Sequence, residues 1–211
     1  VRVVLIQNAL RNTVSSFTPG QNLPVYLAFG EIEREIFRTV GISCRQYQPI
    51  GSVKLGLALV EEKDRPHQAF DLAFISQYRP SMFEHRPSLL ELRMETNQKY
   101  LFQLCCRYAQ AHTLTLAVIT KSREPQTQLV EQEYYKRLAS GLPLHFVYAD
   151  KTQRELDSYL AGLASGLVIH PASTLGFELL AAGKKVVLGA TVHPELIQAW
   201  GIKHYVDALP D

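Results

Sequence analysis

The stretch GLVIHPASTLGFELLAAGKKVVLG, residues 166–189, contains the structural unit from which the fold can be inferred. An apolar run ends at His170-Pro171, a short hydroxylated turn follows, and a helix-like segment then extends to Gly183. A second apolar run begins at Val186. A hydroxyl residue just before a helix and a glycine just after it are the usual boundary residues. The order therefore predicts a buried strand, a helix starting near Ser173, and a second buried strand.

The same alternation continues along the rest of the chain. Short apolar runs rich in β-branched and aromatic residues are typical of parallel strands that are covered on both faces. We expect strands near residues 3–6, 25–29, 72–75, 114–119, 144–147, 166–169 and 186–188, and helices near 31–40, 88–112, 128–139, 152–165 and 175–182. Alternating strands and helices of this kind predict an α/β doubly wound fold.

A charged stretch interrupts the pattern at LALVEEKDRPHQAFD, residues 57–71, and marks a domain boundary. We assign residues 61–211 to one Rossmann-like domain and residues 1–60 to the remnant of a preceding one. The chain begins within an apolar strand without an initiator Met, so we expect the N-terminal domain to be incomplete. Gly51-Ser52 and the Lys54 that follows read as a hinge between the domains.

Composition limits the functional classes. A hydrophobic fraction of 46% and a charged fraction of 20% are those of an ordinary globular protein. The net charge of +2 is carried by Lys and Arg residues spread along the chain, which argues against a nucleic-acid partner. Three cysteines form neither a disulfide framework nor a zinc motif, and no apolar stretch is long enough to span a membrane. These features predict a cytoplasmic protein.

Polar residues follow several of the predicted strands. In an open parallel sheet, ligands bind at the carboxyl ends of the strands. Four such segments could therefore face one crevice, and they are residues 76–79, 120–123, 148–150 and 170–174. Arg79 and Lys121 favour an anionic ligand there.

The turn at 170–174 is the most informative of these segments. Ser173 and Thr174 stand where a helix starts, and free backbone N–H groups at a helix start bind phosphate. Glu178 could accept hydrogen bonds from a ribose diol, and His170 could donate to a phosphate. The alternative is that Ser173 only caps the helix, that Glu178 is a solvated acid, and that His170 merely ends a strand.

Several common catalytic motifs are missing from the sequence. It contains no GxGxxG, no GxxxxGK[ST] and no GxSxG, which argues against dinucleotide dehydrogenases, P-loop enzymes and α/β-hydrolases. No cluster of metal-ligating residues is seen, so we predict no tightly held metal. Gln7-Asn8 directly after the first strand offers two amides suited to sugar hydroxyls, or else closes a strand-to-loop turn.

These segments, in this order, resemble a known family. The strand followed by Gln7-Asn8, the FG pair at 29–30, PIGSVKLG at 49–56 and ASTLGFELLAAGKKVVL at 172–188 resemble the GT-B glycosyltransferases of bacterial surface and capsular polysaccharide biosynthesis. Among these, the surface carbohydrate biosynthesis proteins and Kdo transferases are the most similar. The resemblance implies a GT-B type α/β fold of two Rossmann-like domains with parallel sheets.

The resemblance also implies roles for individual residues. Residues 61–211 would bind the nucleotide sugar, and residues 1–60 would lie on the acceptor side, where Gln7 and Asn8 face the acceptor and Glu31 is the candidate catalytic acid. No resident cofactor is implied, and His170-Pro171 favours a CMP-linked donor. The residues implied to bind the donor are Ser76, Gln77, Arg79, Lys121, Ser122, His170, Pro171, Ser173, Thr174 and Glu178.

The sequence thus predicts a metal-independent glycosyltransferase that moves a sugar to a surface polysaccharide or lipopolysaccharide, with CMP-Kdo as one candidate donor. Its expected partners are a nucleotide sugar and a glycan or lipid-linked acceptor, with peripheral contact to the inner membrane as an option. Two alternatives stay open. One is a sugar-nucleotide epimerase or hydrolase of the same architecture, and the other is a non-catalytic domain that binds a glycan or a partner.

Overall fold

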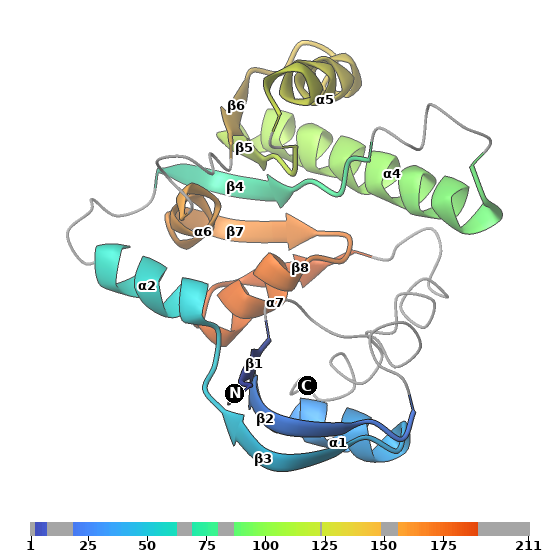
Figure 1. Cartoon of the computed structure of the whole chain (residues 1–211). Coiled ribbons are helices and arrows are strands. Elements are labelled where there is room, and N and C mark those ends of the chain that lie inside the picture. Colours follow the sequence, from blue (N-terminus) through green and yellow to red (C-terminus); the bar gives the residue numbers. More distant parts are fainter. Residues whose placement is uncertain are drawn as a thin grey trace. The chain divides into compact units, whose positions relative to one another are not determined.

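The computed structural model describes residues 3–7, 19–62, 69–79, 87–122, 124–148 and 156–189 (Figure 1). The described residues separate into two compact units, with the division between Gly56 and Leu57. We call the described residues before this division unit 1 and those after it unit 2. Each unit is built around its own parallel sheet.

Unit 1 holds a three-stranded parallel sheet in the order β1-β2-β3. Its strands are β1 (Leu5–Ile6), β2 (Asn22–Ala28) and β3 (Ser43–Pro49), and α1 (Ile32–Thr39) connects the last two. The rings of Tyr26 and Phe37 meet edge to face at 4.9 Å in its core. Strand β3 was not predicted. Its sequence SCRQYQP is mostly polar, so it lacks the apolar run that marked the others.

Unit 2 holds a five-stranded parallel sheet in the order β6-β5-β4-β7-β8. The strands are β4 (Phe70–Ile75), β5 (Leu116–Ile119), β6 (Leu144–Val147), β7 (Ser165–His170) and β8 (Val186–Leu188). Counted from β4, this order is 3-2-1-4-5, as in the Rossmann fold. The α/β class and the parallel sheets are therefore confirmed, and the order is compatible with a Rossmann-like domain.

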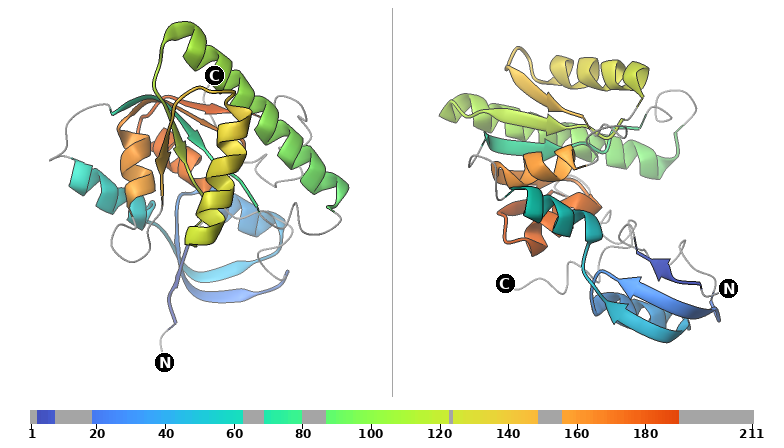
Figure 2. Two further views of the ribbon diagram at one scale, coloured as in Figure 1. Left: turned by 90° about the horizontal axis from the view of Figure 1, so that it is seen from above. Right: turned by 60° about the vertical axis from the view of Figure 1, so that its left-hand side comes forward.

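Four helices cover the two faces of this sheet (Figure 2). Helices α4 (Leu89–His112) and α5 (Pro125–Leu138) pack on one face, where Phe74, Phe102 and Tyr135 meet edge to face. Helices α6 (Asp157–Leu163) and α7 (Thr174–Ala181) pack on the other. The last two residues of β7 face opposite sides of the sheet. Ile169 packs in the core on the side of α4 and α5, and His170 lies against Gly176 of α7.

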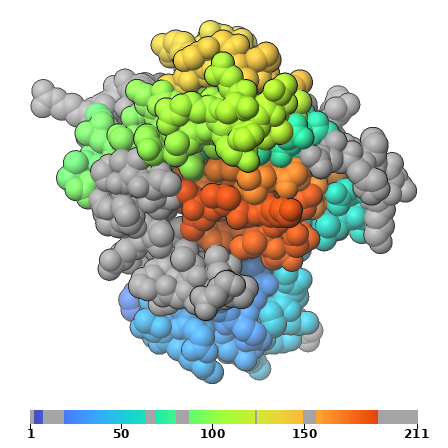
Figure 3. All heavy atoms as spheres, turned by 180° about the vertical axis from the view of Figure 1, so that it is seen from behind, coloured from blue at the N-terminus to red at the C-terminus, as the bar shows by residue number. Residues whose placement is uncertain are grey.

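Helix α4 follows its sequence prediction closely. Ser88 caps it, with its Oγ accepting the Glu91 N–H at 3.2 Å while the Glu91 carboxylate accepts the Ser88 N–H at 2.8 Å. The helix forms a continuous green band across the rear of unit 2 (Figure 3). Within the described ranges, neither this helix nor any other combines the length and the apolar character needed to cross a membrane.

The segment expected to form a hinge leads into a helix. Val53 begins α2 (Val53–Glu62), whose first turn is closed by Ser52 Oγ accepting the Leu55 N–H at 3.2 Å. The division between the units lies within this helix, and the hinge stays a prediction. One local prediction was wrong. The helix predicted over 152–165 ends at Leu163, because Ser165 already belongs to β7 and donates its hydroxyl to the Ala161 carbonyl at 2.6 Å. Part of that predicted helix, residues 152–155, lies outside the described residues.

The contact between α6 and α7 yields a test of the packing in unit 2. A Cβ added at Gly162 would lie 2.3 Å from Leu179 Cδ1, and Leu179 is fully buried. We expect Gly162→Ala to lower the free energy of unfolding by about 2 kcal/mol, since overpacking a closed core forces side chains out of place. Urea denaturation measures the change.

The matched control is Gly56→Ala in α2, where an added Cβ meets nothing within 4 Å. There the better helix propensity of alanine should leave stability equal or raised by about 0.5–1 kcal/mol. Equal behaviour of the two variants would contradict the close packing of α6 on α7.

Candidate functional site

The turns after β5, β4 and β7 lie along one edge of the unit 2 sheet. These three strands are neighbours and all parallel, so their carboxyl ends point the same way. The chain order reverses between β4 and β7, and this switch point is where open α/β sheets bind ligands. The structure therefore brings most of the predicted donor-binding residues to one edge, namely Ser76, Gln77, Arg79, Lys121, Ser122, His170, Pro171, Ser173 and Thr174.

A buried glutamate on α5 joins the turns after β4 and β5. Glu131 is fully buried, and its Oε1 accepts the Lys121 N–H at 3.1 Å while its Oε2 accepts the Ser122 N–H at 2.9 Å. The Ser76 hydroxyl donates to the same carboxylate. We call Glu131 with these three donors the α5 clamp. Sequence reasoning missed Glu131 altogether.

Ser76 has no hydrogen-bonding capacity left for a ligand in this arrangement. Besides donating to Glu131, its Oγ accepts the Tyr135 hydroxyl at 2.8 Å and the Tyr78 N–H at 3.0 Å. Burial, first of all, raises the pKa of Tyr135 well above its ordinary 10, so this phenol stays protonated and donates. Ser76 thus fixes the turn that leads to Arg79, and its own contact with a donor remains a prediction.

Two cationic side chains are presented by these turns. Arg79 is exposed, and the Lys121 ammonium lies 3.4 Å from Gln77 Oε1. The Gln77 N–H is itself held by Gln98 Oε1 at 2.6 Å. Loss of solvent lowers the pKa of Lys121 below 10.5, the nearby Arg79 charge lowers it further, and Glu131 opposes both. Two cations that repel each other at a strand end favour an anionic ligand between them.

His170 supports the start of α7 from inside. Its ring is 1% exposed, Nδ1 accepts the Ser173 N–H at 2.9 Å, and a Cβ added at Gly176 would lie 2.4 Å from the imidazole. Burial lowers its pKa to about 4, so the ring is neutral and carries its proton on Nε2. His170 therefore shapes the turn, and its predicted contact with a phosphate is untested.

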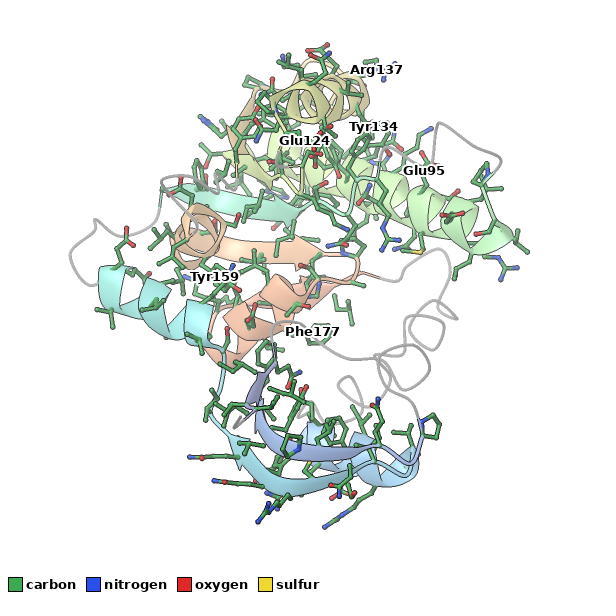
Figure 4. The ribbon with its side chains drawn as sticks, in the orientation of Figure 1. Glu95, Glu124, Tyr134, Arg137, Tyr159 and Phe177 are labelled. Carbon is green, nitrogen blue, oxygen red and sulfur yellow. The ribbon has the colours of Figure 1, made fainter. Side chains whose placement is uncertain are left out.

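Glu178 lies inside unit 2 and contacts α6. It is 6% exposed, and Oε2 accepts the Tyr159 hydroxyl at 2.9 Å (Tyr159 is labelled in Figure 4). Pro171 is buried as well, whereas Ser173 and Thr174 are half-buried at the helix start. The ribose contact predicted for Glu178 stays a prediction, because the carboxylate is already engaged with the protein.

Unit 1 contains a second buried glutamate at a strand end. Glu33 on α1 accepts the Gln7 amide at 2.8 Å through Oε1 and the Gly30 N–H at 3.0 Å through Oε2. Gln7 Oε1 in turn accepts the Phe29 N–H at 2.8 Å. Gln7 is thus buried and holds the turn after the neighbouring strand β2, and its predicted contact with an acceptor stays a prediction. Asn8 lies outside the described residues.

The predicted catalytic acid occupies a different environment. The Glu31 side chain is 62% exposed and pairs with Arg34 at 3.1 Å, and its catalytic role stays a prediction. Among the residues that the structure describes, no three His, Cys, Asp or Glu side chains are grouped to hold a metal ion. A shallow open hollow on the outer side of α5 is lined by Leu129, Val130, Glu133 and Arg137, none of them from the strand-end turns.

A sequence signal for the buried glutamates does exist. Glu33 opens EREIFR and Glu131 opens EQEYYK, so each stands three and four residues before a pair of buried side chains. That spacing puts the acid on the buried face of its helix. The second acid of each segment is exposed and pairs with the cation three residues later, Glu35 with Arg38 at 2.7 Å and Glu133 with Lys136 at 2.9 Å.

The buried imidazole predicts how stability depends on pH. In the unfolded chain His170 titrates near 6.5, and in the native protein near 4. Above pH 6.5 the ring is neutral in both states, and between pH 6.5 and 4 only the unfolded chain takes up the proton. Stability is therefore lost as pH falls through this window, by up to about 3 kcal/mol.

His170→Asn keeps an acceptor for the Ser173 N–H but does not titrate, so its unfolding free energy should fall less between pH 6.5 and 4 than that of the parent. Urea denaturation at a series of pH values gives both slopes. His145→Asn, at an exposed position of β6, serves as the control and should keep the parental slope. Equal slopes for the parent and His170→Asn would contradict the neutral buried ring.

Comparison with known proteins adds one finding to this geometry. No curated protein matches the chain at a significant level. A family model matches residues 4–200, which is nearly the whole chain and spans both units. The chain therefore belongs to the family described as "putative O-antigen biosynthesis protein".

Proposed function

We propose that this protein is a metal-independent glycosyltransferase of surface polysaccharide biosynthesis, and that unit 2 binds the nucleotide part of its donor. The family description agrees with a role in O-antigen biosynthesis. The observation that carries the proposal is the pair of cations, Arg79 and Lys121, on adjacent turns beside the β4–β7 switch point of a 3-2-1-4-5 parallel sheet.

The chemistry of sugar transfer explains why such cations are needed. An acceptor hydroxyl gives up its proton to a carboxylate and its oxygen attacks the anomeric carbon of the donor. The bond to the phosphate oxygen breaks, and the nucleotide leaves with the negative charge. Arg79 and Lys121 would stabilise that charge together with the backbone amides at the start of α7, which is preorganised electrostatic catalysis. His170 contributes by holding the turn before α7, since its Nδ1 bonds the Ser173 N–H.

The remaining parts of the proposal rest on the resemblance. The two units would be the two Rossmann-like domains of a GT-B enzyme, with unit 1 on the acceptor side and Glu31 as its candidate acid. The donor would be a nucleotide sugar, with CMP-Kdo as a candidate, and the acceptor a glycan or lipid-linked glycan. The reaction would take place in the cytoplasm, with peripheral contact to the inner membrane.

One observation favours a second candidate function. Glu131 and Glu178, two acids of unit 2 that follow the strand-end turns, are both buried and hydrogen-bonded to the protein. A domain whose acids serve only its own structure suits a binding role as well as a catalytic one. The alternative is therefore a non-catalytic protein that binds a glycan or a partner enzyme within the same process.

The first test is calorimetric titration of the chain with CMP, CDP, UDP and GDP. We expect one of them to bind, and Arg79→Gln and Lys121→Gln to weaken that binding about tenfold each, because each removes a charge-assisted contact with phosphate. Lys136→Gln, which removes an exposed cation of α5, should bind like the parent.

Incubation with the matching nucleotide sugar then separates the functions. Transfer to a surface-glycan acceptor supports the proposal, and nucleotide release without an acceptor would replace it with a hydrolase or epimerase. Binding of none of the four nucleotides would overturn the donor site and leave the non-catalytic alternative.

A further inference from the structure

The α5 clamp connects three elements through one carboxylate. Glu131 stands on α5, Lys121 and Ser122 follow β5, and Ser76 follows β4. Each carboxylate oxygen accepts at least one hydrogen bond from a turn. A buried carboxylate is costly unless it is satisfied in this way, so the turns and the helix must be arranged together.

Ser76 provides a second connection between the turn after β4 and α5. Because its Oγ bonds Glu131, Tyr135 and the Tyr78 N–H at once, the turn after β4 is attached to α5 at two points. Arg79 is the residue that follows Tyr78. The backbone of both cation-bearing turns is thus fixed relative to a single helix.

The same arrangement occurs a second time in the chain, in unit 1. Glu33 holds the Gly30 N–H of the turn after β2 and the amide of Gln7, which follows the neighbouring strand β1. Glu131 does the same for the turn after β5 and for Ser76, which follows the neighbouring strand β4. In both cases a helix bonds the turn before it and a side chain from the adjacent strand end.

We propose that Glu131 is a positioning residue, which sets the distance and the charge balance between Arg79 and Lys121 for the phosphate of the donor. Its ligand rests on the proposed function, whereas its effect on Lys121 does not. Glu131 would act through the two turns without touching the donor, because it is fully buried beneath them.

The pKa of Lys121 is a readout that loosening of the fold alone would not lower. The charge of Glu131 raises the pKa of Lys121, against the lowering by solvent loss and by Arg79. Neutralising Glu131 should therefore lower the pKa of Lys121. Among the described residues, burial and, after it, the Glu131 charge also raise the pKa of Tyr135 and of Tyr148, and both phenols stay neutral near pH 7.

The experiment compares Glu131→Gln with Glu133→Gln. Both remove one negative charge from α5, but Glu133 is exposed and pairs with Lys136. Lysines are labelled by reductive ¹³C-methylation, and Lys121 is assigned by the signal missing in Lys121→Arg. In the absence of any ligand, we expect the pKa of Lys121 to fall in Glu131→Gln and to stay unchanged in Glu133→Gln. An unchanged value in both variants would overturn the proposal.

The second readout is affinity for the nucleotide that binds best. Glu131→Gln should weaken binding at least tenfold and move the alkaline limit of binding to lower pH, because Lys121 then loses its proton sooner. Glu133→Gln should match the parent in both respects. Parental affinity in a Glu131→Gln protein with a lowered Lys121 pKa would also overturn the positioning role. If the parent binds no nucleotide, the donor site fails, and the ligand-free pKa still decides the charge coupling.

Tyr135→Phe keeps the test decisive if Glu131→Gln does not fold. This variant removes only the hydroxyl that holds Ser76, from a ring that is fully buried and cannot meet a ligand. We expect about threefold or more loss of nucleotide affinity from a looser Arg79 turn. Tyr108→Phe, at an exposed position of α4, is the control. Equal affinity of Tyr135→Phe and the control would contradict a turn held through Ser76.

Discussion

The hydrogen bonds between a buried glutamate and the turns at the strand ends are the interaction on which both units depend. Parallel strands end at one edge of a sheet, and the turns there carry backbone N–H groups without ladder partners. In unit 1 Glu33 accepts such a group, and in unit 2 Glu131 accepts two. Each acid also bonds a side chain from the neighbouring strand end. The carboxylate therefore fixes helix, turn and sheet together.

This arrangement determines which groups remain available to a ligand. In a P-loop the turn amides bind phosphate, whereas here Glu131 already accepts those of Lys121 and Ser122. The Ser173 amide is likewise bonded to His170 Nδ1. Recognition of an anion at this edge would then rest on the side-chain cations Arg79 and Lys121, which stand on adjacent turns, together with the first turn of α7. Site geometry and fold stability consequently depend on the same few buried polar groups.

The sequence predicted the fold better than the site because the two depend on different signals. Apolar runs identified seven of the eight described strands, and the boundary residues located α4 almost to the residue. Strand β3 escaped because its sequence SCRQYQP is mostly polar and carries no apolar run. At the site, residue type suggested ligand contacts for Ser76, His170 and Glu178, yet all three are buried in hydrogen bonds with the protein. In the sequence, a polar residue at a strand end looks the same whether it contacts a ligand or forms hydrogen bonds within the protein.

Taken by itself, the sequence determined the fold class, the parallel strands and the set of residues at the carboxyl edge of unit 2. Hydrophobic periodicity and turn residues are local properties, so they can be recognised in the amino-acid sequence alone. Only the tertiary structure decided the strand order β6-β5-β4-β7-β8, the burial of Glu33 and Glu131, and the inward position of the His170 ring. The strand order and the burial of the two glutamates depend on pairings between segments far apart in the chain, such as Gln7 with Glu33 over 26 residues and Ser76 with Glu131 over 55, and folding alone brings such segments together.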